Sequence, residues 1–278
     1  MGRARSGGAE QPWDEYPYRV LGTRPVTSVV QELILAPDPA PVPFRAGQYV
    51  LLGDRDLRVP PRSYSVANAP RPDGQVRLLV TRVADGPTSG WVHDRLRGGD
   101  RVTLTGPFGT FLPDPDRSGP VLLLAAGSGM APARALAEDL LTSEPGRPVT
   151  LVFSARAAAD TIDDDRFRGR AATHRDFRYL LTLTRDRSAP PGPHVPELLA
   201  RTFDTLAGWE VFASGPPGFV TACAAAALDL GTDPAAVHTE EFFADPQPWL
   251  GAPPGAAVVD EAVRADSAVR SRAGAAGG

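Results

Sequence analysis

The sequence contains no lysine, so all 29 basic side chains are arginines. This absence excludes a Walker-type phosphate loop, a Schiff-base lysine and a Ser-x-x-Lys nucleophile, because each of them needs the lysine amine. It also means that arginine fills ordinary exposed positions, so a single arginine carries little information. The net charge of −4 gives no electrostatic reason to expect a nucleic-acid or membrane partner.

Cysteine and histidine are also scarce. Cys223 is the single cysteine, which excludes an intrachain disulfide and any iron–sulfur or zinc site built from several thiolates of this sequence. It lies in an Ala-rich helical run, which predicts a buried, unreactive thiol. The four histidines are scattered and lack metal-ligand spacing, so we predict no metal site.

Long apolar runs are missing as well. No stretch of 18 apolar residues occurs, and the first ten residues lack the apolar segment of a signal peptide. We therefore expect a soluble, cytoplasmic protein. Its 278 residues, 42% of them hydrophobic, can form one large domain or two of ordinary size.

The clearest local pattern is the stretch from Val121 to Leu141. The continuous apolar run Val121–Ala125 is typical of a strand buried on both faces. Gly127-Ser128-Gly129 follows, and Pro132 suits the first position of a helix. The pattern predicts strand, glycine turn and helix, whose free N–H groups could bind an anion such as a phosphate.

Other interpretations of this stretch are weaker. A nucleophile elbow needs glycines two residues before and after the serine, but Ser128 has Ala126 and Met130 there. A dinucleotide-binding fingerprint needs a third glycine, and position 132 is proline. An ordinary strand–helix connection remains an alternative on this stretch alone.

The first part of the chain predicts a small antiparallel β-barrel after a mobile tail over residues 1–18. Short strand-like segments alternate with clusters of Pro, Gly and Asp. The expected strands are Val26–Leu35, Gln48–Leu52, Ser63–Val66, Gln75–Val83 and Arg101–Thr105. One helix, Ser89–Leu96, interrupts them, with Thr88 or Ser89 as its N-cap.

After Pro115 strand-like and helical segments alternate, which predicts an α/β domain with a parallel sheet. The expected strands are Val121–Ala125, Val149–Ser154, Phe177–Leu183 and Trp209–Ala213. The expected helices are Ala131–Leu141, Val195–Arg201 and Gly218–Leu230. With a boundary at Asp114–Gly119, the domains span residues 19–116 and 117–243. Residues 244–278 are expected to be a disordered tail, with a weak amphipathic helix at Val258–Val269 as the alternative.

Several motifs occur together in one order along residues 19–243. They are Arg62-Ser63-Tyr64-Ser65, Gly86-Pro87-Thr88-Ser89, Gly106-Pro107-Phe108-Gly109, Gly127-Ser128-Gly129 with Pro132, Gly215-Pro216-Pro217-Gly218 and His238-Thr239-Glu240-Glu241-Phe242. With this set the chain resembles the ferredoxin–NADP reductase superfamily, of the oxygenase-reductase type without a fused [2Fe-2S] domain. The resemblance implies an FAD-binding β-barrel followed by an NAD(P)-binding α/β domain.

The resemblance also implies which residues hold the flavin. Arg62 would pair with the FAD pyrophosphate, since a planar guanidinium suits two phosphate oxygens. The Tyr64 ring would pack on the isoalloxazine, and the Ser65 hydroxyl would lie near flavin N5. Gly86 and Ser89 match the second phosphate-binding turn of the family, which favours FAD over FMN.

On the nicotinamide side, the resemblance assigns the coenzyme pyrophosphate to the turn with Gly127, Gly129 and Pro132. Gly215 and Pro216 belong to the second coenzyme-binding motif. Ser214 precedes them, where the family often has the cysteine beside nicotinamide C4, so hydride transfer is expected to be slower or less tightly oriented.

Glu240 and Phe242 match the Glu-x-aromatic pair of the family near the flavin. Phe242 would cover one flavin face until the nicotinamide displaces it. Phe243 is the alternative for that role, and a buried strand end is the structural alternative for either phenylalanine.

Coenzyme choice depends on the ends of two strands. An NAD site has an acidic residue after its second strand, but here Arg156 follows Ser154-Ala155. Thr184-Arg185 ends a later strand and resembles the Ser-Arg pair that binds the 2′-phosphate. The sequence therefore favours NADPH, with NADH as the alternative.

The resemblance predicts a reductase that takes a hydride from NADPH or NADH onto FAD. It would pass single electrons to a separate protein, such as a ferredoxin, an oxygenase component or a P450 system, because one cysteine cannot hold a four-cysteine cluster. The alternatives are a flavin reductase or diaphorase and a non-catalytic flavin-binding subunit. A dehydrogenase of organic alcohols is disfavoured, since neither a Tyr–Lys pair nor a zinc site is evident.

Overall fold

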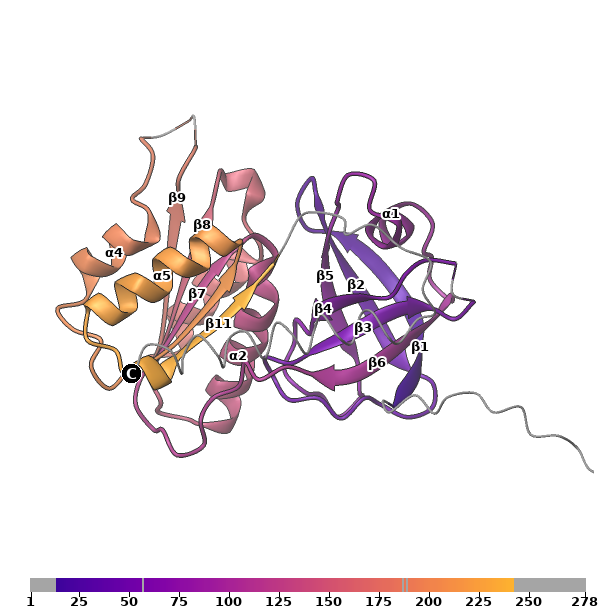
Figure 1. Cartoon of the computed structure of the whole chain (residues 1–278), viewed down its shortest axis with the longest axis horizontal. Coiled ribbons are helices and arrows are strands. Elements are labelled where there is room, and N and C mark those ends of the chain that lie inside the picture. The colour runs from indigo at the N-terminus through magenta and orange to yellow at the C-terminus, as the bar shows by residue number, and fades with distance from the viewer. Residues whose placement is uncertain (1–13, 57, 187, 189, 243–278) are drawn as a thin grey trace, which may run out of the picture.

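Two kinds of strand pairing divide the chain into two halves that lie side by side (Figure 1). The computed structural model describes residues 14–56, 58–186, 188 and 190–242. The first half has an antiparallel sheet and the second a parallel one. This confirms the predicted fold class of a β-barrel domain followed by an α/β domain.

The antiparallel sheet has six strands in the order β4-β3-β6-β1-β2-β5. They are β1 (Glu15–Pro25), β2 (Val30–Pro37), β3 (Tyr49–Asp54), β4 (Arg62–Ser65), β5 (Val76–Thr81) and β6 (Arg101–Phe108), with helix α1 (Pro87–Asp94) between β5 and β6. An isolated bridge pairs Val66, just after the edge strand β4, with Leu78 of the other edge strand. The sheet thereby curls around one apolar core, in which Tyr18, Leu33, Leu52 and Leu104 are fully buried.

Three local predictions in this half were wrong. Residues 15–18, which were assigned to the tail, form the start of β1. The expected strand Val26–Leu35 begins with a turn, in which the N–H of Val26 donates to the carbonyl of Val30, and β2 starts only there. Gly86, and neither Thr88 nor Ser89, is the N-cap of α1.

The parallel sheet has five strands in the order β11-β10-β7-β8-β9. They are β7 (Val121–Ala126), β8 (Val149–Ala155), β9 (Phe177–Leu183), β10 (Glu210–Gly215) and β11 (Val237–Glu241). The helices are α2 (Met130–Ser143), α3 (Asp164–Thr173), α4 (Val195–Thr202) and α5 (Pro217–Asp229), with 3-10 turns η1 (Gly127–Gly129), η2 (Ala158–Asp160) and η3 (Pro234–Ala236).

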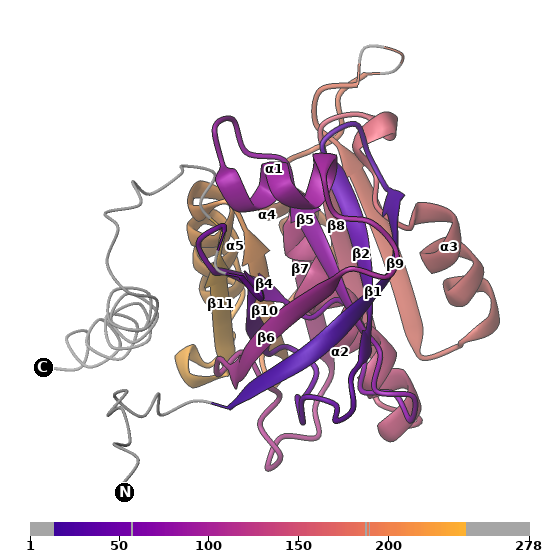
Figure 2. The same ribbon diagram turned by 90° about the vertical axis from the view of Figure 1, so that its right-hand side faces the viewer.

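Alternation along the strands places helices on both faces of this sheet, as Figure 2 shows. Leu123 of β7 and Leu151 of β8 face the side covered by α2 and α3. Leu122 and Leu124 of β7 face the side covered by α4 and α5, where Cys223 is buried. The predicted burial of Cys223 is thereby confirmed.

The sequence analysis missed two elements of this half and misplaced one residue. Helix α3 buries only Phe167, so it has little apolar periodicity. Strand β11 was noticed only as a motif, because its residues are mostly polar. Pro132 is the third residue of α2 and not the first, since the helix begins at Met130 directly after η1.

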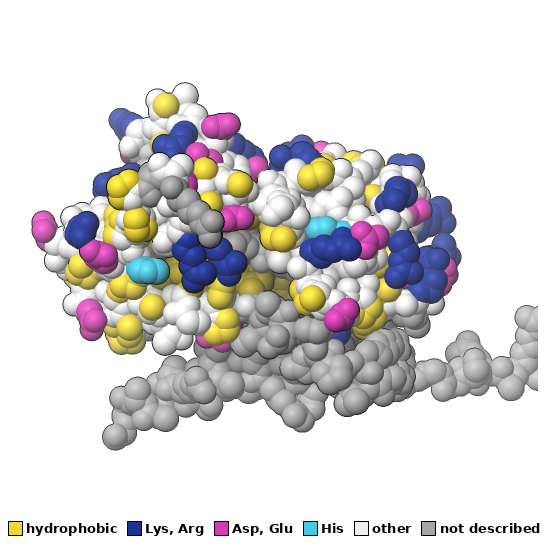
Figure 3. Space-filling view, turned by 90° about the horizontal axis from the view of Figure 1, so that it is seen from above, with side chains coloured by type: hydrophobic (Ala, Val, Ile, Leu, Met, Phe, Trp, Pro, Cys, Tyr) yellow, Lys and Arg dark blue, Asp and Glu magenta, His cyan; other side chains and the backbone are white. Residues whose placement is uncertain are grey.

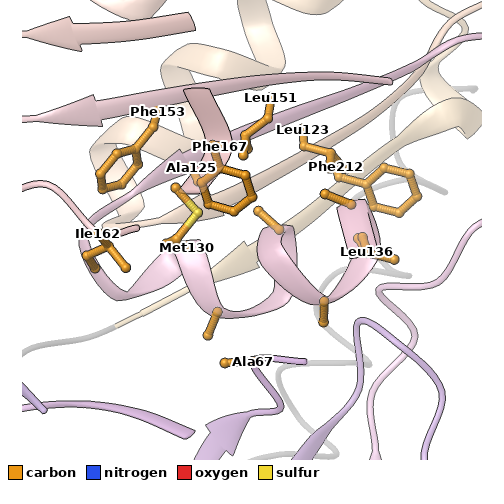
Figure 4. Close-up of a cluster of buried hydrophobic side chains, with 14 of the residues drawn as sticks. Ala67, Leu123, Ala125, Met130, Leu136, Leu151, Phe153, Ile162, Phe167 and Phe212 are labelled. Carbon is orange, nitrogen blue, oxygen red and sulfur yellow. The ribbon is translucent and has the colours of Figure 1, made fainter. Parts of the chain in front are cut away.

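The two halves share an apolar cluster around α2 (Figure 4). Met130 and Leu136 of this helix lie in the same cluster as Ala67 and Phe111 of the first half. The ring of Phe111 packs edge-on against Phe212 of β10, with 5.1 Å between ring centroids. Helix α2 therefore serves both as a cover of the parallel sheet and as a contact to the barrel.

Several predictions fall outside the described residues: most of the N-terminal tail, the C-terminal tail 244–278 with the alternative helix Val258–Val269, and Phe243. Within the part of the chain that the structure describes, no helix is both long and apolar enough to cross a membrane.

Candidate active site

The carboxyl ends of the five parallel strands meet at one edge of the sheet, which is where open α/β sheets bind ligands. The site residues that the sequence placed in the second half lie at or just after the end of a strand or, for Pro132, in the first turn of the helix that follows. They are Gly127, Gly129 and Pro132 after β7, Arg156 after β8, Thr184 and Arg185 after β9, Ser214, Gly215 and Pro216 at or after the end of β10, and Glu240 and Phe242 at β11.

A hydrogen bond joins the two halves at β11, the outermost strand of the parallel sheet. The hydroxyl of Ser65, the last residue of β4, donates to the carboxylate Oε1 of Glu240 on β11. Burial raises the pKa of Glu240 to about 7, although the bond from Ser65 acts in the opposite direction. Glu240 can therefore hold or release a proton near neutral pH, beside the strand that carries the flavin motif.

Ser214 lies directly beside Glu240. In the sheet register Ser214 of β10 is opposite Glu240 on one side and Ala125 of β7 on the other. Ser214 is fully buried, and its hydroxyl donates to the carbonyl oxygen of Gly129 at 2.8 Å. Ser214 thus binds the glycine turn, and its hydroxyl proton is already used in that bond.

Gly129 is required by the close approach of two backbones. A Cβ atom at this position would lie 2.2 Å from the carbonyl oxygen of Ser214. Gly127 is required for a different reason, because its φ of 56° lies in the left-handed region. The two glycines bring the start of α2 against β10, so that its free N–H groups open onto the strand edge.

Phe242 follows β11 and is fixed by its backbone. Its N–H donates to the carbonyl oxygen of Gly215 at 2.9 Å. The side chain is half-buried. This bond places Phe242 beside the Gly215-Pro216 turn, where α5 begins after its N-cap Pro216.

In the first half, the flavin motif and the turn before α1 lie together. Arg62 and Tyr64 lie on the same face of β4, paired with Leu52 and Val50 of β3. The Thr88 hydroxyl in the first turn of α1 donates to the carbonyl oxygen of Pro60 at 2.5 Å. This buried bond links the α1 N-terminus to the segment that enters β4, and so brings the turn before α1 close to the Arg62 strand.

The side chain of Ser89 is turned into its own loop. Its hydroxyl accepts from the N–H of Val83 at 3.1 Å and donates to the carbonyl of Gly86 at 3.2 Å. A Cβ at Gly86 would lie 2.7 Å from this hydroxyl. Ser89 therefore shapes the turn, and an anion there would meet backbone N–H groups of α1 instead of the Ser89 hydroxyl.

Arg156 and Arg185 are brought together although they are 29 positions apart in the sequence. The N–H of Arg185 donates to the carbonyl oxygen of Arg156 at 2.7 Å, and the N–H of Thr184 donates to Ala155 at 3.0 Å. Both arginine side chains are exposed. Figure 3, which views the molecule from above, shows further arginine side chains in dark blue on both halves of this face.

Thr88 is the contributor that the sequence analysis missed, since it was considered only as a helix cap. Its partner is a backbone carbonyl 28 residues away, and no local pattern indicates such a bond. The only available signal was the pair Pro60-Pro61, which removes two backbone donors directly before Arg62.

The residues present fit the two cofactors that the motifs imply. The barrel side offers a guanidinium, an aromatic ring and a helix N-terminus close together, which suits a diphosphate joined to a flat ring system. On the sheet side, there is open space where a Cβ of Gly127 would be, so a ligand can come close to the backbone of the turn.

Comparison with known proteins agrees with this geometry. The family model described as the oxidoreductase FAD-binding domain matches residues 33–112, and the oxidoreductase NAD-binding domain matches residues 123–225. The chain is 37% identical over 212 residues to the reductase subunit of an aromatic O-demethylase from an Amycolatopsis species, covering 73% of this chain and 62% of that protein. It is 32% identical over 191 residues to the phenol 2-monooxygenase reductase component DmpP from a Pseudomonas species, covering 66% and 53%.

The chain thus spans between about half and two thirds of the length of these two relatives. Among solved structures, the Amycolatopsis cytochrome P450 reductase GcoB superposes with a TM-score of 0.76 at 32% identity, covering 87% of this chain and 74% of that one. The ferredoxin reductase of a carbazole 1,9a-dioxygenase gives 0.74 at 28% identity, covering 84% and 70%. The two matched domains, their order and these superpositions agree, and the chain belongs to the ferredoxin–NADP reductase-like family of FAD- and NAD(P)-dependent oxidoreductases.

Proposed function

We propose that this protein is the reductase component of an oxygenase or cytochrome P450 system, and that it delivers single electrons to a separate protein. The observation that carries the proposal is the Ser65–Glu240 hydrogen bond, which joins the flavin motif of the barrel to the nicotinamide edge of the sheet. The relatives named above are reductase components of such systems, which supports this choice of acceptor. The single cysteine supports an acceptor that carries any iron–sulfur cluster itself.

On the barrel side, we assign Arg62 and the N-terminus of α1 to the FAD pyrophosphate. The Thr88–Pro60 bond supports this assignment, because it holds the two anion-binding groups near each other. Tyr64 would pack on the flavin ring. The domain boundary that fits these roles is Asp114–Gly119, between the end of β6 and the start of β7.

On the sheet side, the turn Gly127–Gly129 would bind the coenzyme pyrophosphate, and Phe242 would cover the flavin face. The hydride and single-electron chemistry is supplied by the bound cofactors themselves. Ser214 would orient the nicotinamide indirectly, by holding the Gly129 carbonyl. Glu240 would hold a proton at its carboxylate near pH 7 and exchange it through the Ser65 hydroxyl.

For the coenzyme we propose NADPH over NADH. The adjacent strand ends carry Arg156 and Arg185, whose guanidinium groups suit a dianionic 2′-phosphate. No acidic residue follows β8 directly, where a site for the ribose hydroxyls of NAD would need one.

The first test is the visible spectrum of the purified protein, followed by anaerobic addition of NADPH or NADH. Oxidised-flavin bands that bleach support the reductase, and the faster coenzyme identifies the preference. Turnover with small acceptors that a carrier protein does not accelerate would favour a diaphorase instead. A colourless protein that FAD cannot reconstitute would contradict the proposal.

A further inference from the structure

A buried arginine near the start of α2 also links the two halves. Arg134 lies in the second turn of α2, and only 1% of its side chain is exposed. Its guanidinium donates to Glu32 of β2 at 2.8 Å and to Asp163, the N-cap of α3, at 2.6 Å. Its Nε donates to the backbone carbonyl of Ala67. One side chain therefore binds three segments, two from the barrel and one from the sheet domain.

The partners of Arg134 are themselves fixed. Glu32 is completely buried and also accepts two hydrogen bonds from Arg24, at 3.0 and 2.9 Å. Although burial alone raises the pKa of Glu32, the guanidinium groups of Arg134 and Arg24 lower it below its usual range. Glu32 therefore stays ionised, and the pair remains charged inside an apolar interface.

The position of Arg134 relates it to both cofactor motifs. It lies five residues after Gly129 on the helix that starts at the glycine turn. Its acceptor Ala67 lies two residues after Ser65, and the N–H of Ala67 is held by the carbonyl of Arg77 at 2.8 Å. The guanidinium thus joins the helix that follows the glycine turn to the segment that directly follows the strand with the flavin motif.

Charge inside an interface is poorly suited to adding stability, because desolvation offsets most of the attraction between buried ions. The better-attested use of a buried ion pair is to specify one arrangement of the two surfaces, because every other arrangement leaves the ions without partners. A guanidinium group is planar and its N–H donors point in fixed directions, so its hydrogen bonds specify one relative position of the two domains. Apolar contacts specify it less sharply, because they tolerate small shifts of the packed surfaces.

We propose that Arg134 is a positioning residue, which sets the distance and orientation between nicotinamide and flavin by fixing α2 against the barrel. The inference rests on the proposed hydride transfer between these two cofactors. It predicts that the barrel and the sheet domain keep a single relative arrangement only while Arg134 makes its hydrogen bonds to both domains.

The chain offers a matched control in Arg147, whose side chain is 5% exposed. Its Nε donates to the carbonyl of Gly119 at 2.8 Å, and its two terminal nitrogens donate to Glu144 and Glu210, each at 2.9 Å. Both arginines therefore bind one carbonyl and two carboxylates. The direct partners of Arg147 all lie in the sheet domain, so Arg147→Lys tests the cost of losing a buried guanidinium whose own hydrogen bonds do not cross between the domains.

The experiment compares Arg134→Lys and Arg147→Lys with the parent chain. Spin labels on Leu21→Cys of β1 and Leu228→Cys of α5, both exposed, report the distance between the domains. Burial raises the pKa of Cys223 to about 12, so this native thiol stays unlabelled. Stopped-flow flavin reduction by NADPH and NADH is measured on the same proteins without labels.

We expect Arg134→Lys to broaden the distance distribution and to slow flavin reduction by about 10- to 100-fold. Its FAD content and its Michaelis constant for the coenzyme should stay within about twofold of the parent. Arg147→Lys should leave both the distance distribution and the reduction rate unchanged. If Arg134→Lys does not fold, Glu32→Gln weakens the same link and should give the same pattern.

A parental reduction rate in Arg134→Lys, with either a narrow or a broad distance distribution, would overturn the proposal. An equal slowing in Arg147→Lys would also overturn it, since the effect would then follow any buried arginine. A parent protein that neither coenzyme reduces would instead reject the proposed function, and the distance measurement on Arg134 would still stand by itself.

Discussion

At the scale of single residues, the titration of Glu240 makes the stability of the fold depend on pH. Its folded-state pKa of about 7 lies above the ordinary value of 4.5, so the fold favours the protonated acid. Its contribution to stability is therefore complete below about pH 4.5 and is lost as the pH rises through 7. A pKa difference of this size corresponds to about 1–3 kcal/mol after allowing for the accessible part of the side chain.

Glu240→Gln should remove this dependence, because glutamine cannot titrate. We expect the variant to gain stability relative to the parent between pH 5 and pH 8, measured by urea unfolding at both values. The rate of flavin reduction should also lose any inflection near pH 7. The same stability difference between variant and parent at both pH values would show that Glu240 titrates normally.

Arg62 should determine whether the flavin is retained. Arg62→Ala removes hydrogen bonds from a charged group to phosphate, each worth about 1.5–3 kcal/mol, so the dissociation constant of FAD should rise at least about tenfold. The ratio of flavin to protein absorbance after purification measures this. The control is Arg71→Ala, on an exposed turn of the same domain, which should keep full flavin occupancy. Full flavin occupancy in Arg62→Ala itself would reject the contact between Arg62 and the pyrophosphate.

Arg185 should discriminate between the two coenzymes. Arg185→Ala is expected to raise the Michaelis constant for NADPH about tenfold or more and to change that for NADH little, because only NADPH carries the 2′-phosphate. Arg178→Ala, at an exposed position near the start of β9, the strand that Arg185 follows, should change neither constant. Equal increases for both coenzymes would argue against a role in 2′-phosphate binding.

At the scale of elements, the contact between η1 and β10 leaves no room for a side chain. Gly129→Ala would place a Cβ 2.2 Å from the Ser214 carbonyl oxygen, and backbone would have to move. We expect a loss near the upper end of the roughly 1–3 kcal/mol typical of overpacking, together with weaker coenzyme binding. Gly127→Ala, where nothing lies within 4 Å, should cost only the roughly 1–2 kcal/mol of a left-handed residue. Thermal and urea unfolding of both variants measure the two losses. A larger loss of stability in Gly127→Ala than in Gly129→Ala would show that this packing is unimportant.

Elements with strong apolar patterns could be predicted from the sequence, and weakly patterned ones could not. β9 was predicted with its observed bounds, because five of its seven residues are apolar and only Arg178 and Thr182 interrupt them. β1 was not predicted as a strand at all, because only Tyr18 and Val20 are buried in it and Pro17 interrupts the pattern. The site residues came from motifs, whereas the Arg134–Glu32 pair joins positions 102 residues apart and leaves no local signal.

At the scale of the whole molecule, Phe111 and Phe212 join the segment after β6 to the parallel sheet. Phe111→Ala removes a buried ring and its edge-on contact, so we expect a loss of about 3–5 kcal/mol and a separation of the two domains' unfolding transitions. Differential scanning calorimetry measures both effects. Phe203→Ala, which removes a similar edge-on contact to Trp209 within one domain, should not separate the transitions. A single transition in Phe111→Ala would show that other contacts suffice to couple the domains.

The hydrogen bond from Ser65 to Glu240 can form only late in the synthesis of the protein. The two residues are 175 positions apart, and translation at about 5–20 residues per second makes the second available about 9–35 seconds after the first. During that interval the flavin motif has left the ribosome while its carboxylate partner does not yet exist. The barrel can therefore meet FAD before the nicotinamide edge is complete, and the Ser65–Glu240 bond forms only once β11 joins the sheet.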